Sequence, residues 1–360
     1  MTRVFVSDCE GPISKNDNAY ELTAHFVPDG DKLFSIISRY DDVLADVTKK
    51  SGYNAGDTLK LILPFLKAYD VTDKKMEDFS EQNLLLIAGT KETLKHIMGK
   101  AEAFIVSTSY EHYIRALCKV TGFPFENTYC TRLGIDKYNI TTEEKTKLKA
   151  IAKEIAAIHR VTIPSAAKSL SDFSSKDQET VKRLDEIFWK EIPEMSCARS
   201  FFEVIAVGGE QKAQAIRDIT KKHQLPLSSV MYVGDSITDV QAFQLVRENG
   251  GLTISFNGNN YAVKKAEVSV MSENNIVTAV LTDVFLNHGK PQTLQMLQNW
   301  NPQALKQSPV DSTLLNRFFM LYPKALPKVQ IVTQSNMESL SKESSEFRKK
   351  VRGEAVGKLG

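Results

Sequence analysis

The sequence predicts an α/β fold, a sandwich of helices around a parallel sheet. Short runs along the chain are apolar throughout rather than alternating, which is typical of strands buried on both faces. Helical patterns lie between these runs, and strands that alternate with helices favour a parallel sheet. The predicted strands are Val4–Val6, Ala103–Val106, Val204–Val207, Val230–Val233, Leu252–Phe256 and Val268–Met271. The predicted helices between them are Thr90–Met98, Tyr110–Val120, Gln211–His223 and Ile237–Arg247.

Two stretches interrupt this alternation and predict inserted helical units. Residues 15–84 separate the first strand from the next and are mostly helical in pattern. Residues 141–197 begin with TTEE, which resembles a capping box, and remain polar and helix-rich. We therefore expect a core of residues 1–14, 85–140 and 198–287, and a C-terminal helical extension of residues 288–360. The basic stretch Arg348–Arg352 in that extension could contact an acidic partner, but we expect a solvated, frayed end.

The overall composition excludes several classes of protein. The 360 residues include 46 basic and 44 acidic side chains, for a net charge of +2. This balance predicts no binding to nucleic acid or to a charged membrane surface. No apolar run approaches the roughly 20 residues of a membrane-spanning helix. The four cysteines form no CxxC pair and indicate reduced thiols, so we expect a cytoplasmic protein.

Polar side chains follow three of the predicted strands. Asp8 and Glu10 end the first strand, Ser107 ends the second, and Asp235 and Asp239 follow VMYVG. Lys212 lies upstream of this last strand. Because the carboxyl ends of parallel strands meet at one edge of a sheet, we expect these groups to converge there.

Convergence of the acidic side chains requires compensating positive charge. At ~4 Å and an effective dielectric of ~20, two carboxylates repel each other by about 4 kcal/mol. Oxygen ligands of this kind suit Mg²⁺, which also takes a phosphate oxygen. Lys212 supplies a fixed cation, and Ser107 is expected to supply a hydroxyl at the start of a helix, where an anion is favoured. Together they predict a phosphoryl-binding site in which a carboxylate can act as nucleophile.

The same residues resemble the motifs of the haloacid dehalogenase (HAD) superfamily, and most closely those of its phosphoserine phosphatases. The matching segments occur in the family's order: VFVSDCEGPI, FIVSTSY, KAQAI and GDSITD. The resemblance implies a Rossmannoid three-layer sandwich, with residues 15–84 placed where this family inserts a helical cap. The start DCEG and the large helical inserts also resemble archaeal HAD proteins labelled as subunit R of the energy-converting hydrogenase.

The resemblance implies a role for each motif residue. Asp8 would be the nucleophile that forms an aspartyl-phosphate, and Glu10 the acid and base. The phosphoryl oxygens would be bound by Ser107, Thr108 and Lys212. The Mg²⁺ ion would be held by Asp8, the backbone carbonyl of Glu10, and Asp235, with Asp239 in support. The expected activity is Mg²⁺-dependent hydrolysis of a small phosphorylated metabolite.

Glu10 departs from the family pattern, which has Asp at this position. Its extra methylene makes phosphotransfer to another acceptor an alternative to hydrolysis. A second alternative is a non-catalytic scaffold that binds protein partners through its helical inserts. Dehalogenation is disfavoured, because dehalogenases of this superfamily need no Mg²⁺, whereas GDSITD supplies metal-binding carboxylates.

Overall fold

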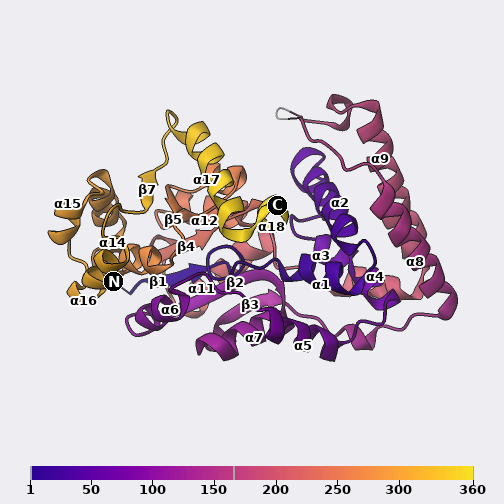
Figure 1. The fold of residues 1–360 in the computed structure, drawn as a ribbon, viewed down its shortest axis with the longest axis horizontal. Helices are drawn as coiled ribbons and strands as arrows, with labels where there is room; N and C mark the ends of the chain where they lie inside the picture. Colours follow the sequence, from indigo (N-terminus) through magenta and orange to yellow (C-terminus); the bar gives the residue numbers. More distant parts are fainter. Residues whose placement is uncertain (1, 165–166, 360) are drawn as a thin grey trace.

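A seven-stranded sheet forms the centre of the protein, as seen in a computed structural model that describes residues 2–164 and 167–359 (Figure 1). The strand order is β3-β2-β1-β4-β5-β6-β7, and every pair is parallel except β6 with β7. The strands are β1 (Val4–Ser7), β2 (Ala103–Tyr110), β3 (Thr128–Thr131), β4 (Val230–Gly234), β5 (Leu252–Phe256), β6 (Val268–Met271) and β7 (Lys328–Ile331). The predicted α/β sandwich is therefore confirmed.

Helices cover both faces of this sheet because its strands are apolar on both faces. Phe5, Ile105 and Met231 point into one hydrophobic cluster, while Val4, Val6 and Val106 point into another. The first face is covered by α6 (Thr90–Met98), α7 (Glu111–Thr121), α14 (Ile276–Gln298), α15 (Pro302–Lys306) and α16 (Ser312–Leu321). The second face is covered by α11 (Glu210–Lys222), α12 (Val240–Glu248) and α13 (Asn260–Lys265).

The two inserted segments pack together beside the sheet. Residues of 15–84 and of 141–197 share a single hydrophobic cluster, which includes Leu33, Phe65, Ile151 and Phe188. The first segment forms α1 (Asn18–Phe26), α2 (Gly30–Asp42), α3 (Thr58–Leu61), α4 (Leu63–Ala68) and α5 (Asp73–Asn83). The second forms α8 (Thr142–Ala157) and α9 (Ser175–Glu186), and α10 (Arg199–Glu203) follows it. The predicted capping box is present at the start of α8, where Thr141 and Glu144 bond each other's backbone N–H groups.

The C-terminal segment returns to the sheet. Strand β7 pairs with β6, and α17 (Met337–Arg352) then packs on α13 and β6. The short helix α18 (Glu354–Gly357) follows, and Leu359 belongs to the cluster of the inserted helices. Figure 1 shows α17 beside β5 and α12, and α18 between the sheet and α2. The expectation that the basic end is solvated and frayed is wrong, because α17 is ordered and Arg348 is buried.

One predicted strand is absent from the structure, and two observed strands were not predicted. Residues Val204–Val207 form no strand: Val204 N donates to Ser200 O, and the backbone N–H and C=O of Val207 bond to the hydroxyls of Thr131 and Thr108. Strands β3 and β7, at the two edges of the sheet, were not predicted because TYCT and KVQI are not continuous apolar runs. No helix in the described parts of the chain is long and apolar enough to span a membrane.

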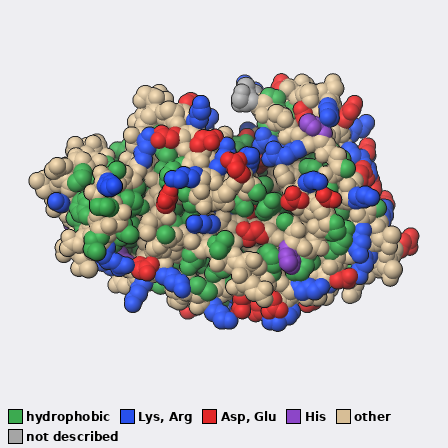
Figure 2. Space-filling view, in the orientation of Figure 1, with side chains coloured by type: hydrophobic (Ala, Val, Ile, Leu, Met, Phe, Trp, Pro, Cys, Tyr) green, Lys and Arg blue, Asp and Glu red, His purple; other side chains and the backbone are tan. Residues whose placement is uncertain are grey.

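Lysine, arginine, aspartate and glutamate side chains are intermingled on the face drawn in Figure 2. This mixture agrees with the near balance of charges in the sequence.

Candidate active site

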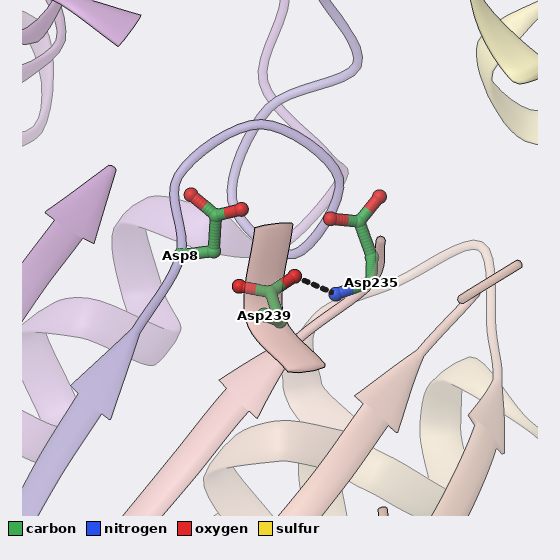
Figure 3. Close-up of side chains that lie close together, drawn as sticks. All are labelled: Asp8, Asp235 and Asp239. Carbon is green, nitrogen blue, oxygen red and sulfur yellow. Dashed lines mark hydrogen bonds between the residues drawn. The ribbon is translucent and has the colours of Figure 1, made fainter. Parts of the chain in front are cut away.

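The predicted acidic residues meet at the carboxyl ends of β1 and β4, which are neighbours in the sheet (Figure 3). The next strand along the chain after β1 lies on its other side, so the order of strands reverses here. Such a reversal is where open α/β sheets bind ligands. Asp8, Asp235 and Asp239 each offer one carboxylate oxygen within 4.8 Å of the others, and all three residues are buried.

Lys212 lies within this cluster and joins Asp8 to Asp239. Its Nζ is 2.6 Å from Asp8 Oδ2 and 2.8 Å from Asp239 Oδ1, and its side chain is fully buried. Burial opposes the charge on Lys212, but Asp239 and Asp8 together hold the pKa of Lys212 above its ordinary value. Burial raises the pKa of Asp8 to about 6, although Lys212 acts in the opposite direction. Lys212 therefore stays an ammonium ion between the side chains of Asp8 and Asp239.

Asp239 uses both of its oxygens within the protein. Oδ1 accepts from Lys212 and from the buried hydroxyl of Tyr232, at 2.8 and 2.7 Å. Oδ2 accepts from the backbone N–H of Asp235 at 2.8 Å (Figure 3) and from that of Ser236 at 2.9 Å. These four hydrogen bonds leave Asp239 suited to positioning Lys212 and the Asp235 backbone rather than to binding a ligand.

Asp235 is neutralised from a different part of the chain. Its Oδ2 accepts from Arg348 of α17, and also from Arg352 Nη1 at 3.1 Å. Both arginine side chains are only 3% exposed. Burial and the neighbouring Arg352 lower the pKa of Arg348 well below its ordinary value. The sequence analysis missed both residues at this site.

Gly11 allows the loop after β1 to pass close to Asp235. Its φ is 109°, a conformation that residues with a Cβ rarely adopt, and an added Cβ would overlap the Asp235 carboxylate. The glycine in DCEG is therefore required on two grounds, backbone conformation and space.

Ser107 and Thr108 lie at the carboxyl end of β2 and line the same cavity as Asp8. Ser107 Oγ is 3.0 Å from Ser109 Oγ, and Thr108 Oγ1 donates to Val207 O. The expectation that Ser107 starts a helix is wrong, because β2 continues to Tyr110 and α7 begins at Glu111. Ser107 can still offer its hydroxyl to an anion, but without the N-terminus of a helix directly behind it.

Glu10 lies in the loop between β1 and α1 and also lines the cavity. Its Oε1 accepts from the backbone N–H of Asn18, the first residue of α1, at 2.6 Å. Burial, and next the Asp17 carboxylate, raise the pKa of Glu10 well above its usual range. A carboxyl group with a raised pKa is able to act as a proton donor near neutral pH.

The cavity has a volume of about 90 Å³, enough for several waters or a phosphoryl group. One wall carries Asp8, Ser107 and Asp235 from the sheet, and another carries Arg348 and Arg352. The inserted segment 15–84 lines it with Asp17, Phe34, Ser38, Asp41, Asp42, Gly56, Thr58 and Leu59. A group bound here would lie between the ends of the strands and the inserted segment.

The donor set fits a magnesium ion. Asp235 Oδ1 is buried and has no hydrogen-bond partner among the described residues, so one anionic oxygen is left for a cation. Asp8 supplies a second carboxylate within 4.8 Å. Carboxylate oxygens are the ligands that Mg²⁺ takes in proteins. A role for Asp8 and Asp235 as ligands, with Asp239 as their support, is chemically consistent with these contacts.

Comparison with known proteins identifies the family. The family profile for haloacid dehalogenase-like hydrolases matches residues 71–283, more than half of the chain. A solved gene product of Archaeoglobus fulgidus is similar with a TM-score of 0.81 and 25% identity, over 100% of this chain and 99% of that chain.

Weaker similarities exist to solved phosphoserine phosphatases. The apo form has a TM-score of 0.42 and 14% identity, over 81% of this chain and 100% of that chain. A substrate-bound form also has a TM-score of 0.42 and 14% identity, over 76% of this chain and 95% of that chain. These values are too low to transfer function. No curated protein matches the sequence. The profile match over most of the sheet shows that the chain belongs to the haloacid dehalogenase-like hydrolase family.

Proposed function

We propose that this hydrolase is a Mg²⁺-dependent phosphatase that acts on a small phosphorylated metabolite through an aspartyl-phosphate on Asp8. One observation carries the proposal. The Asp8 carboxylate lies 2.6 Å from the buried ammonium group of Lys212, on the wall of a cavity that Ser107 and Thr108 also line. A nucleophile paired with a fixed cation, and the Ser107 hydroxyl at the same small cavity, are parts that phosphoryl transfer needs.

The first step forms a bond between an Asp8 oxygen and the phosphorus atom. The bond from phosphorus to the ester oxygen breaks, and Glu10 donates a proton to that leaving oxygen. Lys212 and the Ser107 hydroxyl offer donors to the phosphoryl oxygens, which carry the developing charge. A bound Mg²⁺ would supply further charge neutralisation between Asp8 and the phosphoryl group.

The second step releases phosphate. Glu10, now ionised, takes a proton from water, whose oxygen attacks phosphorus and regenerates the Asp8 carboxylate. An alcohol in place of water would give phosphotransfer by the same chemistry. The cavity wall formed by residues 15–84 limits the access of water or an alcohol to the phosphorylated Asp8.

Substitution Asp8→Asn tests the nucleophile. We expect turnover of p-nitrophenyl phosphate to fall by about a thousandfold or more, since the covalent step is lost. Beryllofluoride, a phosphoryl mimic, should bind the original chain in the presence of Mg²⁺ but not this variant. Asp31→Asn, an exposed carboxylate in the first turn of α2, is the matched control and should retain full turnover. Unchanged turnover in Asp8→Asn would contradict the proposal.

Substitution Glu10→Gln tests the proton donor. p-Nitrophenolate leaves without protonation, whereas an alkoxide does not. We therefore expect formation of the aspartyl-phosphate to slow by about a hundredfold with an alkyl phosphate and much less with p-nitrophenyl phosphate. The measurement is the burst rate with each substrate. Equal slowing with both substrates would argue against a proton-donor role for Glu10.

A further inference from the structure

The proposed reaction steps do not involve two buried cations in the cavity, Arg348 and Arg352. Arg348 and Arg352 lie one helical turn apart on α17 and line the same cavity as the Asp8 nucleophile. Each guanidinium group carries five N–H donors arranged to fit a carboxylate or phosphate group. Arg348 Nε is buried and finds no acceptor within the parts of the chain that the structure describes.

Anchoring of the C-terminal helix does not explain these arginines. Helix α17 is held to the rest of the protein by Leu340, which is 1% exposed, and by Ser344, whose Oγ donates to Gly258 O at 2.6 Å. Lys350 forms a further ion pair with Glu273 at the surface. The helix would therefore be attached without two charges at the end of its buried face.

The position of Arg352 connects it to the leaving-group side of the site. Its Nε donates to Lys15 O at 3.0 Å, and another of its nitrogens donates to Asn16 O, in the loop that follows Glu10. Its charge acts on Glu10 and on Asp17, where it lowers the pKa of each carboxyl group against the larger effect of burial. Since Glu10 is the proposed proton donor to the leaving oxygen, Arg352 borders the part of the substrate beyond that oxygen.

Binding of a cation to Asp235 would change the partners of both arginines. Their shared acceptor is Asp235 Oδ2, and the free oxygen of the same carboxylate is the candidate metal ligand. A divalent cation bound to that carboxylate would compensate the negative charge that now neutralises the two guanidinium groups. Arg352 would keep the carbonyl oxygens of Lys15 and Asn16, whereas the buried Arg348 would lose charge from its Asp235 partner. An anionic group beside them would offset that loss.

We propose that Arg348 and Arg352 form a substrate-binding subsite for a second anionic group, carried by the leaving portion of the phosphorylated substrate. The substrate class is then a phosphomonoester that bears a carboxylate or a second phosphate close to the ester oxygen. In the absence of metal, both arginines pair with Asp235. When a divalent cation binds Asp235, the arginines become available to the anionic group of the substrate. This inference rests on the proposed function.

Non-hydrolysable ligands test the subsite by binding rather than by turnover. Phosphonoacetate and 3-phosphonopropionate carry a carboxylate, and ethylphosphonate and propylphosphonate are their counterparts without it. Titration calorimetry on the full chain with excess Mg²⁺ should show that each carboxylated ligand binds about tenfold or more tightly than its counterpart. With the metal removed by EDTA, the preference should fall to within about twofold, because Asp235 then keeps both arginines.

Three variants assign the preference to these residues. Arg352→Met and Arg348→Lys should each reduce it to within about twofold while the alkylphosphonates still bind. Arg348→Lys keeps the positive charge, so the fold remains supported where Arg348→Met would leave Asp235 under-neutralised. Lys350→Met removes one positive charge from the same helix outside the cavity and should keep the full preference. Circular dichroism and thermal unfolding verify that each variant is folded.

The outcomes separate this inference from the proposed function. If alkylphosphonates bind in a Mg²⁺-dependent manner but a carboxylate adds nothing, the subsite is wrong and the phosphatase proposal stands. The subsite is also wrong if the preference for carboxylated ligands persists in Arg352→Met and Arg348→Lys, or if removal of the metal by EDTA leaves that preference unchanged. If no phosphonate binds and p-nitrophenyl phosphate is not turned over, both proposals are overturned.

Discussion

The two halves of the acidic cluster are neutralised in different ways. Asp8 and Asp239 share Lys212, which comes from α11 within the sheet sandwich and has no exposed surface. Asp235, at the end of the adjoining strand, is neutralised by Arg348 and Arg352 from a helix 113 residues or more farther along the chain. The first half is part of the core of the fold, whereas the second depends on how the C-terminal segment docks.

The difference separates charges that are fixed from charges that can be exchanged. Lys212 has both of its carboxylate partners buried with it, and Asp239 is further held by Tyr232 and two backbone N–H groups. Among the residues that the structure describes, Asp235 Oδ1 has no hydrogen-bond partner and Arg348 Nε, beside the cavity, has no acceptor. We therefore expect changes to the first half to cost more folding stability than changes to the second.

The largest effect is expected for Lys212→Met. It leaves two carboxylates facing each other in a buried site, which should lower the free energy of unfolding by about 3–5 kcal/mol. Urea titration followed by tryptophan fluorescence measures this change. Lys222→Met, at the exposed end of the same helix, is the control and should change stability by less than about 0.5 kcal/mol. A cost below about 1 kcal/mol for Lys212→Met would remove the distinction between the halves.

Gly11→Ala is expected to have the next largest effect, because it disturbs the boundary between the two halves. The new Cβ would clash with the Asp235 carboxylate, and the alanine would have to adopt a positive φ. Together these effects should lower the free energy of unfolding by about 2–3 kcal/mol. Gly122→Ala is a matched control, since Gly122 also has a positive φ (72°) but its Cβ would meet no described atom within 4 Å. Equal losses of stability in the two variants would show that the contact with Asp235 is unimportant.

A smaller loss, about 1–2 kcal/mol, is expected for Arg352→Met. Asp235 keeps Arg348 as a partner in this variant, so its charge is not left alone. The double variant with Asp235→Asn should cost less than the sum of the single changes, and the difference measures the coupling of the pair. The same urea titrations apply. Additive losses would mean that Arg352 and Asp235 do not stabilise each other.

The smallest effect is expected for Lys350→Met on the same helix. Its ion pair with Glu273 is exposed on both sides, at 68% and 63%, so the loss should stay within about 0.5 kcal/mol. A larger loss of stability would show that the surface charges of α17 contribute to its docking, and that Arg352 does not differ from Lys350 in this respect.

Much of the site follows from the sequence because parallel strands bring their carboxyl ends together. Asp8, Ser107 and Asp235 follow apolar runs in the sequence and line one cavity in the structure. Thr108 also lines the cavity, although its hydroxyl bonds to Val207 O. Their catalytic and metal-binding roles, like the boundaries of the inserted segments, stay predictions until the variants are measured.

The errors share a physical origin in contacts between distant segments. Val204–Val207 has the composition of a strand, but the backbone groups of Val207 bond to the hydroxyls of Thr108 and Thr131 rather than to a neighbouring strand. The end of the chain has the composition of a solvated helix, yet Arg348 is buried. A signal was present in the spacing, since Leu340, Ser344, Arg348 and Arg352 recur every four residues along one face of α17. Nothing in that pattern names the partner of the two arginines.

Local sequence patterns were sufficient to predict the alternation of strands and helices and the acidic residues at the strand ends. Apolar runs, helical periodicity and turn residues act over a few neighbouring positions, so they can be read locally. The tertiary structure alone decided that Asp235 is paired with the C-terminal helix and that the inserted segments share one hydrophobic cluster. Such pairings depend on which surfaces pack together across more than 100 residues, and no local preference encodes them.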